Sequence, residues 1–235
     1  KTRIATVEHL MSALRGLNID NAFVEVYGPE VPILDGSSVS YIDALEAVGV
    51  IEQTKPVKYL QVLKPISVSI DDRFVYLLPA SDLKISCRVN YKHPVVGLQH
   101  FEYRHNTFNY IAEVAKAKTF GFLNEVEKLK EKGLALGGSY KNALVLGSDN
   151  VINKDIMSYS DEFVRHKVLD IMGDMALCGN GTRLLAHIVA YKSGHELHKL
   201  ALKELRQRKT CFKVLEEPVL VDEKAYTEKA FSLLQ

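Results

Sequence analysis

One segment of the sequence carries a histidine and two carboxylates at helical spacing. His166, Asp170 and Asp174 follow one another at intervals of four residues, so on a helix their side chains lie along one face, one turn apart. An imidazole and a carboxylate at this spacing can bind one metal ion together, and Zn²⁺ is favoured because it accepts nitrogen and oxygen ligands. Taken alone, these residues could equally be a histidine at the start of a helix beside solvated acids. Further candidate ligands are therefore needed to decide whether they form a metal site.

A second acid and imidazole, Glu8 and His9, are adjacent near the start of the chain. Neighbours on a helix point about 100° apart, so both side chains do not easily bind the same ion. We expect His9 to bind the metal and Glu8 to act as a base on a metal-bound water. With His166 and Asp170 this makes two histidines and one carboxylate, which leaves a fourth position open for water, as catalytic zinc sites require. The ion would lower the pKa of that water to about 7.

Two more residues suit a hydrolysis. His195 follows Ser193 and Gly194, where glycine permits a sharp turn and close approach of a substrate. A histidine outside the ligand set could protonate a leaving amine, with Asp174 fixing its tautomer. Thr119 could donate its hydroxyl to an oxyanion. Plainer interpretations stay open, in which Thr119 is an ordinary strand residue and His195 a helix cap. The other histidines are interpreted as surface or core residues: His93, His100, His105, His187 and His198.

Six helices are predicted from apolar residues at helical spacing together with capping and stop residues. The helix that carries His166 runs from about Asp161 to Cys178 and contains no proline. Ser37 or Ser38 can cap the second helix of the chain. The other five helices are Thr6–Gly16, Tyr41–Val48, Thr107–Ala117, Leu123–Lys132 and Glu196–Arg208.

Strands are predicted where β-branched and aromatic residues alternate between turn residues. Three consecutive strand-like runs are expected to form a meander, and an α+β fold in two layers follows. The first strand has no partner before residue 53, so we expect its partners in a segment that precedes Lys1. The strand-like segments are Ala22–Tyr27, the meander Tyr59–Ile70, Phe74–Leu78 and Leu83–Val89, then Gln99–Tyr103, Lys118–Phe122, Ala143–Leu146 and Phe212–Val221.

Composition excludes several classes of protein. The chain of 235 residues is 47% hydrophobic and 25% charged with a net charge of +1, which is typical of a globular protein and gives no reason to expect nucleic-acid binding. No apolar run is long enough to span a membrane, and no signal peptide is visible. The three cysteines, Cys87, Cys178 and Cys211, are far apart and odd in number, which favours reduced thiols in the cytoplasm.

Several short motifs, in unbroken order along nearly the whole chain, resemble one enzyme family. They are similar to the zinc-dependent UDP-3-O-acyl-N-acetylglucosamine deacetylases of lipid A biosynthesis. The segments that carry the resemblance are Thr6–Leu10, Asp20–Asn21, Pro29–Ser37, Lys118–Phe122, Leu136–Ser139, Arg165–Asp170 and Lys192–His195.

The resemblance implies two similar two-layer α+β domains with zinc in the cleft between them. The first would comprise residues 1–56 and lack its opening strands, and the second would comprise residues 57–235. The family also implies a role for each site residue. His9, His166 and Asp170 would bind Zn²⁺, Glu8 would be the base, and His195 the acid with Asp174 behind it. Thr119 and Lys167 would steady the tetrahedral intermediate and the substrate.

The family's acyl passage lies on an insert in the second domain. Apolar residues suit a fatty chain, and glycine leaves room for it, although plain core packing explains the same residues. Lys192 is expected to bind the diphosphate as a point charge. The residues expected to line the passage are Phe122, Val126, Leu129, Leu134, Gly138 and Val145.

The expected function is therefore that of a cytoplasmic zinc hydrolase. It would remove the N-acetyl group from a UDP-linked, 3-O-acylated N-acetylglucosamine and leave acetate and a free amine, an early committed step of lipid A biosynthesis. Two alternatives stay open. One is a sugar-nucleotide binding module whose metal site does not function. The other is a zinc amidohydrolase for another acylated amino sugar, or one half of a fusion whose partner domain lies outside this chain.

Overall fold

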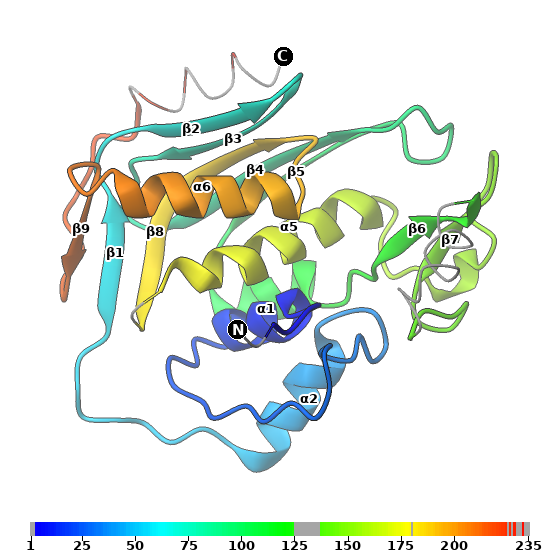
Figure 1. Ribbon diagram of the computed structural model, residues 1–235, viewed down its shortest axis with the longest axis horizontal. Helices are drawn as coiled ribbons and strands as arrows, with labels where there is room; N and C mark the ends of the chain where they lie inside the picture. Colours follow the sequence, from blue (N-terminus) through cyan, green and yellow to red (C-terminus); the bar gives the residue numbers. More distant parts are fainter. Residues whose placement is uncertain are drawn as a thin grey trace.

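The computed structural model describes residues 3–124, 137–179, 181–224, 226, 228 and 232. These residues form a seven-stranded mixed sheet with helices packed on one face, and a separate pair of short strands (Figure 1). The α+β class is confirmed. The strands of the large sheet are β1 (Lys58–Val62), β2 (Ile66–Ile70), β3 (Arg73–Leu78), β4 (Leu83–Asn90), β5 (Leu98–Arg104), β8 (Thr182–Tyr191) and β9 (Phe212–Leu215).

Strand β8 is the centre of the large sheet. It pairs in parallel with β1 and β4 and antiparallel with β3, and all its residues from Leu184 to Ala190 are buried. When both faces of a strand are covered, its sequence is a nearly continuous run of apolar residues. Because β8 lies between β3 and β4, the predicted three-strand meander is wrong beyond the β2–β3 hairpin. The apolar run Leu184–Tyr191 comes from about a hundred residues further along the chain, so local turn signals could not reveal this insertion.

The predicted helices are confirmed wherever the structure describes them. The segment Leu123–Lys132 lies almost entirely outside the described residues, and residues 107–114 form one short turn of α-helix followed by a π-helical turn. The helices are α1 (Glu8–Gly16), α2 (Val39–Val48), α3 (Thr107–Asn109) with its π-helical continuation Tyr110–Val114, α5 (Glu162–Met175) and α6 (His195–Gln207), with single 3₁₀ turns at Lys154–Ile156 and Ala176–Cys178.

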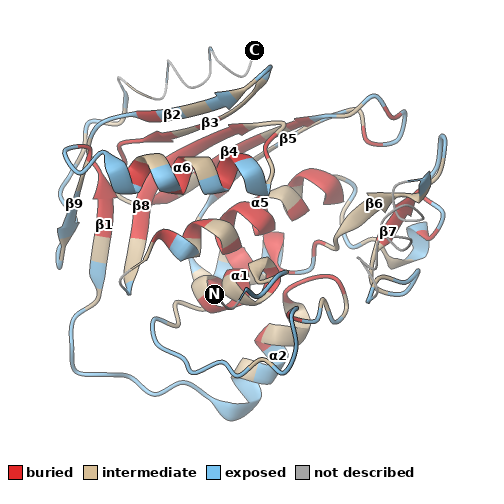
Figure 2. Ribbon diagram, in the orientation of Figure 1, coloured by how far each residue is buried: buried red, intermediate tan, exposed pale blue. Residues whose placement is uncertain are grey.

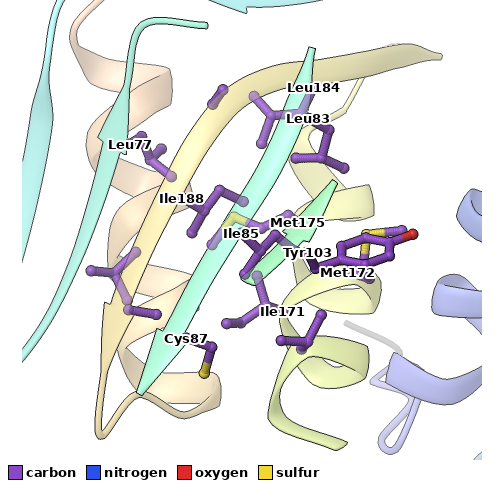
Figure 3. Packing of buried hydrophobic residues seen from close by; sticks show 14 of the residues in the cluster. Leu77, Leu83, Ile85, Cys87, Tyr103, Ile171, Met172, Met175, Leu184 and Ile188 are labelled. Atoms are coloured by element: carbon purple, nitrogen blue, oxygen red, sulfur yellow. The ribbon is translucent and has the colours of Figure 1, made fainter. Parts of the chain in front are cut away.

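Helix α5 lies between the sheet and α1, so it is buried on nearly all sides (Figure 2). Its apolar face packs against alternate residues of β4 and β8, with Ile171 and Met175 beside Ile85 and Ile188 (Figure 3). Helix α6 packs on β2, on β3 and on α5. Sheet, α5 and α1 therefore form successive layers, and the polar residues of α5 that face α1 are enclosed by the fold.

The small parallel pair, β6 (Phe120–Phe122) and β7 (Leu144–Leu146), lies beyond the N-terminal end of α5 (Figure 1). Its apolar side chains form a second cluster with Phe163 of α5. This cluster ties the segment 117–122 to the helix that carries the predicted metal ligands.

The strand predicted over Ala22–Tyr27 is wrong. This segment belongs to no helix or strand, and both Phe23 and Tyr27 are fully exposed. A strand exists only as part of a ladder, and within the described residues the nearest pairing is a single bridge between Ala5 and Glu30. The division into domains 1–56 and 57–235 stays a prediction. Among the described residues, no helix is long and apolar enough to cross a membrane.

Candidate active site

Helices α1 and α5 approach closely at Gly173. A Cβ atom at this position would lie 2.0 Å from the carbonyl oxygen of Glu8, so only glycine allows the two backbones to meet here. This contact brings the first turn of α1, with Glu8 and His9, against the turns of α5 that carry His166 and Asp170. Two segments more than 150 residues apart in the sequence thus supply one site.

His9, His166 and Asp170 come together as predicted. One potential ligand atom of each lies within 4.8 Å of the others, and all three residues are buried. The two imidazole rings meet edge to face with centroids 5.1 Å apart. Burial lowers the pKa of both histidines, that of His166 to about 3, so each presents a neutral ring.

The hydrogen bonds of His166 fix its tautomer. Nδ1 lies 3.0 Å from the carbonyl oxygen of Ala117, and a carbonyl can only accept, so Nδ1 carries the proton. The bare Nε2 then faces Oδ1 of Asp170 at 3.3 Å. Two acceptors at this distance repel each other unless a cation lies between them.

The donor set of these three residues fits a divalent metal ion. Nδ1 of His9 is buried and has no hydrogen-bond partner among the described residues, which is costly for a polar atom unless a ligand satisfies it. The hydroxyl of Ser38 donates to the carbonyl oxygen of His9 at 3.0 Å and holds its backbone. Two neutral imidazoles and one carboxylate are the donors that zinc accepts in catalytic sites.

Lys167 balances the charge of Asp170. Its Nζ donates to Oδ2 of Asp170 at 2.8 Å and lies 5.2 Å from the centre of the Phe120 ring. Burial opposes ionisation of both groups, yet their mutual attraction keeps the pKa of Asp170 well below its usual range and raises that of Lys167. Lys167 therefore contacts a predicted metal ligand directly.

Glu8, His195 and Asp174 line the same site from three elements. Nδ1 of His195 donates to Oδ2 of Asp174 at 2.7 Å, and its Nε2 lies 3.7 Å from Oε1 of Glu8. The hydrogen bond to Asp174 raises the pKa of His195 to about 9, against a smaller opposing effect of burial. At neutral pH the imidazole is thus protonated and can give up a proton. Asp174 stays ionised because, although burial opposes it, the two histidine hydrogen bonds lower its pKa.

His198 is a further residue of this site that was not among the predicted site residues. This residue was interpreted as a surface or core histidine, but its Nδ1 donates to Oδ2 of Asp174 at 2.6 Å and its Nε2 lies 3.0 Å from Oγ of Ser193. The signal was present, because His195 and His198 are three residues apart on one helix and therefore share a face.

Thr119 lies on the segment that borders His166. Its backbone is fixed on both sides, since its N–H donates to the carbonyl oxygen of Gly36 at 2.7 Å and its own carbonyl accepts from Leu144 at 2.8 Å. Ala117 binds the ring of His166, and the ring of Phe120 lies 6.2 Å from it. The backbone of Thr119 is thus fixed between two residues that approach the ring of His166.

The residues predicted for the acyl passage are only partly described. Val126, Leu129 and Leu134 lie outside the described residues. Phe122 and Val145 are on the neighbouring strands β6 and β7, with Phe122 packed against Tyr91 and His93. Gly138 lies in the turn that precedes β7 and is half-buried.

Lys192, predicted to bind the diphosphate, has a protein partner in this structure. Its Nζ donates to Oδ2 of Asp72 at 2.5 Å, and its side chain is 27% exposed. Asp72 lies in the turn between β2 and β3, so the pair links that turn to the loop before α6.

The contact at Gly173 makes a prediction about stability. Gly173→Ala would gain up to about 1 kcal/mol of helix propensity, but the new Cβ would meet backbone atoms that cannot rotate away. We expect overpacking to dominate and to lower the free energy of unfolding by about 1–3 kcal/mol, measured by denaturant unfolding. Zinc affinity should fall as well, because α1 carries His9. Gly137→Ala is the matched control, since no atom of the described residues lies within 4 Å of a Cβ built there. Equal stability of both variants would contradict the close packing.

Known proteins are similar to this chain over most of its length. The family model of LpxC, the UDP-3-O-acyl N-acetylglycosamine deacetylases, matches residues 1–207. Proteins named UDP-3-O-acyl-N-acetylglucosamine deacetylase are similar to this chain. The one from Syntrophus aciditrophicus is 43% identical over 205 residues, which cover 87% of this chain and 64% of the relative. That from Geobacter sp. (strain M21) is 45% identical over 213 residues, with 91% and 69% covered.

The protein of that name from Myxococcus xanthus is 42% identical over 213 residues, which cover 91% of this chain and 67% of the relative. The chain thus spans about two thirds of the length of these relatives. The matched region contains every residue of the candidate site, from Glu8 to His198. The chain belongs to the LpxC family of UDP-3-O-acyl N-acetylglycosamine deacetylases.

Proposed function

We propose that this chain is a zinc-dependent hydrolase that removes the N-acetyl group from UDP-3-O-acyl-N-acetylglucosamine. The observation that carries the proposal is the convergence of His9, His166 and Asp170 on one point, with Glu8 and a protonated His195 beside them. The identity of the substrate is inferred from the names of the relatives. The reaction would be an early committed step of lipid A biosynthesis in the cytoplasm.

His9, His166 and Asp170 would hold the zinc ion. When bound, zinc supplies a polarised acetamide carbonyl and a water whose pKa is lowered to about 7. Side chains of this protein would orient the metal ligands and transfer the protons. Lys167 keeps the carboxylate of Asp170 ionised and oriented by its 2.8 Å hydrogen bond, and Ala117 keeps Nε2 of His166 free for the metal.

Proton transfer is divided between Glu8 and His195. Glu8 accepts a proton from the attacking water as its oxygen bonds to the acetamide carbon. The carbonyl oxygen gains negative charge, which Thr119 and Lys167 would steady by a hydroxyl and an ammonium group. His195 then donates its proton to the amide nitrogen, the C–N bond breaks, and acetate leaves a free amine on the sugar. The opposite charges of Glu8 and His195 before reaction suit these opposite tasks.

The rest of the substrate would be bound outside the metal centre. We assign the acyl chain to the apolar side chains of the small sheet, Phe122 and Val145, together with Val126, Leu129, Leu134 and Gly138. Lys192 would bind the diphosphate, which requires it to exchange its present partner Asp72 for a phosphate oxygen. Since Asp72 is exposed, that exchange costs little.

Acetate release tests the proposal. Zinc-loaded protein is incubated with UDP-3-O-acyl-N-acetylglucosamine, and UDP-N-acetylglucosamine without the acyl chain is the control. We expect acetate from the first substrate and a far lower kcat/KM for the second. Binding of the acylated substrate without any release of acetate would support the alternative, a sugar-nucleotide binding module, and would overturn the proposal.

The raised pKa of His195 predicts the alkaline limb of the pH profile. An acid must be protonated to act, so kcat/KM should fall as the pH rises through the pKa of His195, which is about 9 before a cation is bound. A nearby cation disfavours the imidazolium, which places the limb at or below pH 9. Asp174→Asn replaces the carboxylate by a neutral amide, whose oxygen is a weaker acceptor and carries no charge to favour the imidazolium, so the limb should move toward the ordinary value of about 6.5. An unmoved limb would exclude His195 as the acid.

A further inference from the structure

The carboxylate of Asp174 is shared by two imidazoles. Nδ1 of His195 and Nδ1 of His198 both donate to the same oxygen, Oδ2, at 2.7 and 2.6 Å. The two rings are nearly perpendicular, with an interplanar angle of 85° and centroids 6.1 Å apart. The carboxylate of Asp174 alone would be enough to orient His195, so the second ring, that of His198, requires another explanation.

The two histidines have very different environments. The side chain of His195 is 54% exposed, whereas that of His198 is fully buried. The backbone N–H of His198 donates to the carbonyl oxygen of Gly194 at 3.1 Å, so the ring projects from the first turn of α6. Since Asp174 has little exposure of its own, its buried partner is the fixed one. The exposed His195 is therefore oriented by a carboxylate that His198 already holds in place.

The hydrogen bonds run in one direction toward the carboxylate. Asp174 can only accept, so Nδ1 of His198 donates, and Nε2 is left to accept from the hydroxyl of Ser193 at 3.0 Å. Ser193 is itself buried. Ser193, His198 and Asp174 thus form a connected series whose last member fixes Nδ1–H of His195 and leaves the other nitrogen of that ring directed at Glu8.

We propose that His198 is a positioning residue for the deacetylation, acting through Asp174 to hold the acid His195 in its reactive orientation. The inference rests on the proposed function of the site. Within the described residues, the ring nitrogens of His198 bond to Asp174 and Ser193 and to none of the predicted metal ligands. The charged or titratable groups that face His195 are Asp170 and Asp174 from α5, Glu8 and His9 from α1, and His198 from its own helix.

The same three residues, Asp174, His195 and His198, also have potential ligand atoms within 4.8 Å of one another. Nδ1 of each histidine is already engaged by Asp174, so an ion there would have to displace two short hydrogen bonds. We therefore assign the group to proton positioning. Zinc content at saturation separates the two roles: one zinc per chain agrees with the assignment, and a second zinc that is lost in His198→Leu overturns it.

Three substitutions at His198 form the test. The amide nitrogen of asparagine is as many bonds from the backbone as Nδ1, whereas that of glutamine is one bond further. His198→Asn should therefore keep the hydrogen bond to Asp174, and His198→Gln should misplace it. We expect kcat to fall about 10- to 100-fold in His198→Leu and in His198→Gln, the range found for outer-shell partners, and to stay within about threefold in His198→Asn. KM should be unchanged in all three.

A double-mutant cycle with Ser193→Ala sharpens the result. Removing the hydroxyl should lower kcat in the parent protein but have no effect in His198→Asn, which has no Nε2 to bind it. If His198→Leu does not fold, the comparison of asparagine with glutamine still decides. Equal kcat in the asparagine, glutamine and parent proteins would overturn the inference while leaving the proposed function intact. A parent protein that binds zinc but releases no acetate would instead overturn the proposed function.

Discussion

Replacing Glu8 by glutamine is expected to lower kcat by about 10²- to 10⁴-fold, the usual contribution of a general base, while zinc stays bound. Glutamine keeps the size of the side chain and its position on the first turn of α1, but its amide cannot accept a proton. Glu8 is adjacent to His9 yet projects toward Nε2 of His195 at 3.7 Å, so the metal ligands should be undisturbed. The measurement is steady-state acetate release together with zinc content.

Glu46→Gln is the matched control, because Glu46 is an exposed residue of α2 away from the site. It should retain full activity. A Glu8→Gln protein that binds one zinc and turns over at the parent rate would remove Glu8 from the mechanism. Loss of zinc from the same variant would show instead that Glu8 is a ligand.

Asp170→Asn should have the second large effect, on metal binding and stability together. It removes the only carboxylate of the ligand group. Zinc affinity should therefore fall by more than the 10- to 100-fold that is typical when a residue hydrogen-bonded to a ligand is replaced. It also leaves the ammonium group of Lys167, whose side chain is 17% exposed, beside a neutral group. A fully buried uncompensated charge costs about 3–5 kcal/mol, so the free energy of unfolding of the metal-free protein should fall, by less than that amount.

The two effects of Asp170→Asn can be separated. Adding Lys167→Met removes the unpaired ammonium charge. The double variant should therefore regain most of the lost stability but none of the zinc affinity. Asp161→Asn is the control, since Asp161 pairs with Arg165 at the start of the same helix, away from the ligands. Parent-like zinc affinity in Asp170→Asn would contradict its place in the ligand group.

Local spacing was sufficient to predict one side of the site. His166, Asp170 and Asp174 face one way because α5 is a regular helix, and this follows from sequence alone. The pairing of that helix with Glu8 and His9 depends on a backbone contact at Gly173. No pattern within either segment encodes such a contact, and only the resemblance to a known family could supply it.

Where the sequence-based predictions failed, interactions between distant segments decided the outcome. The meander failed because β8 inserts between two strands that are neighbours in sequence. The segment Ala22–Tyr27 has the residues of a strand but no ladder to join within the described residues. The spacing of His198 and His195 indicates only that the two side chains share a helix face, and it does not show that His198 is buried and bonded to Asp174. Burial and partners are properties of the fold.

The proposed metal centre is tested by a zinc titration of the metal-free protein, with acetate release from UDP-3-O-acyl-N-acetylglucosamine measured at each step. We expect no turnover without metal and a linear rise in rate that ends at one zinc per chain, because the potential ligand atoms of His9, His166 and Asp170 converge on one point. Turnover by the metal-free protein at the rate of the loaded protein, or one tightly bound zinc without any acetate release, would contradict this expectation.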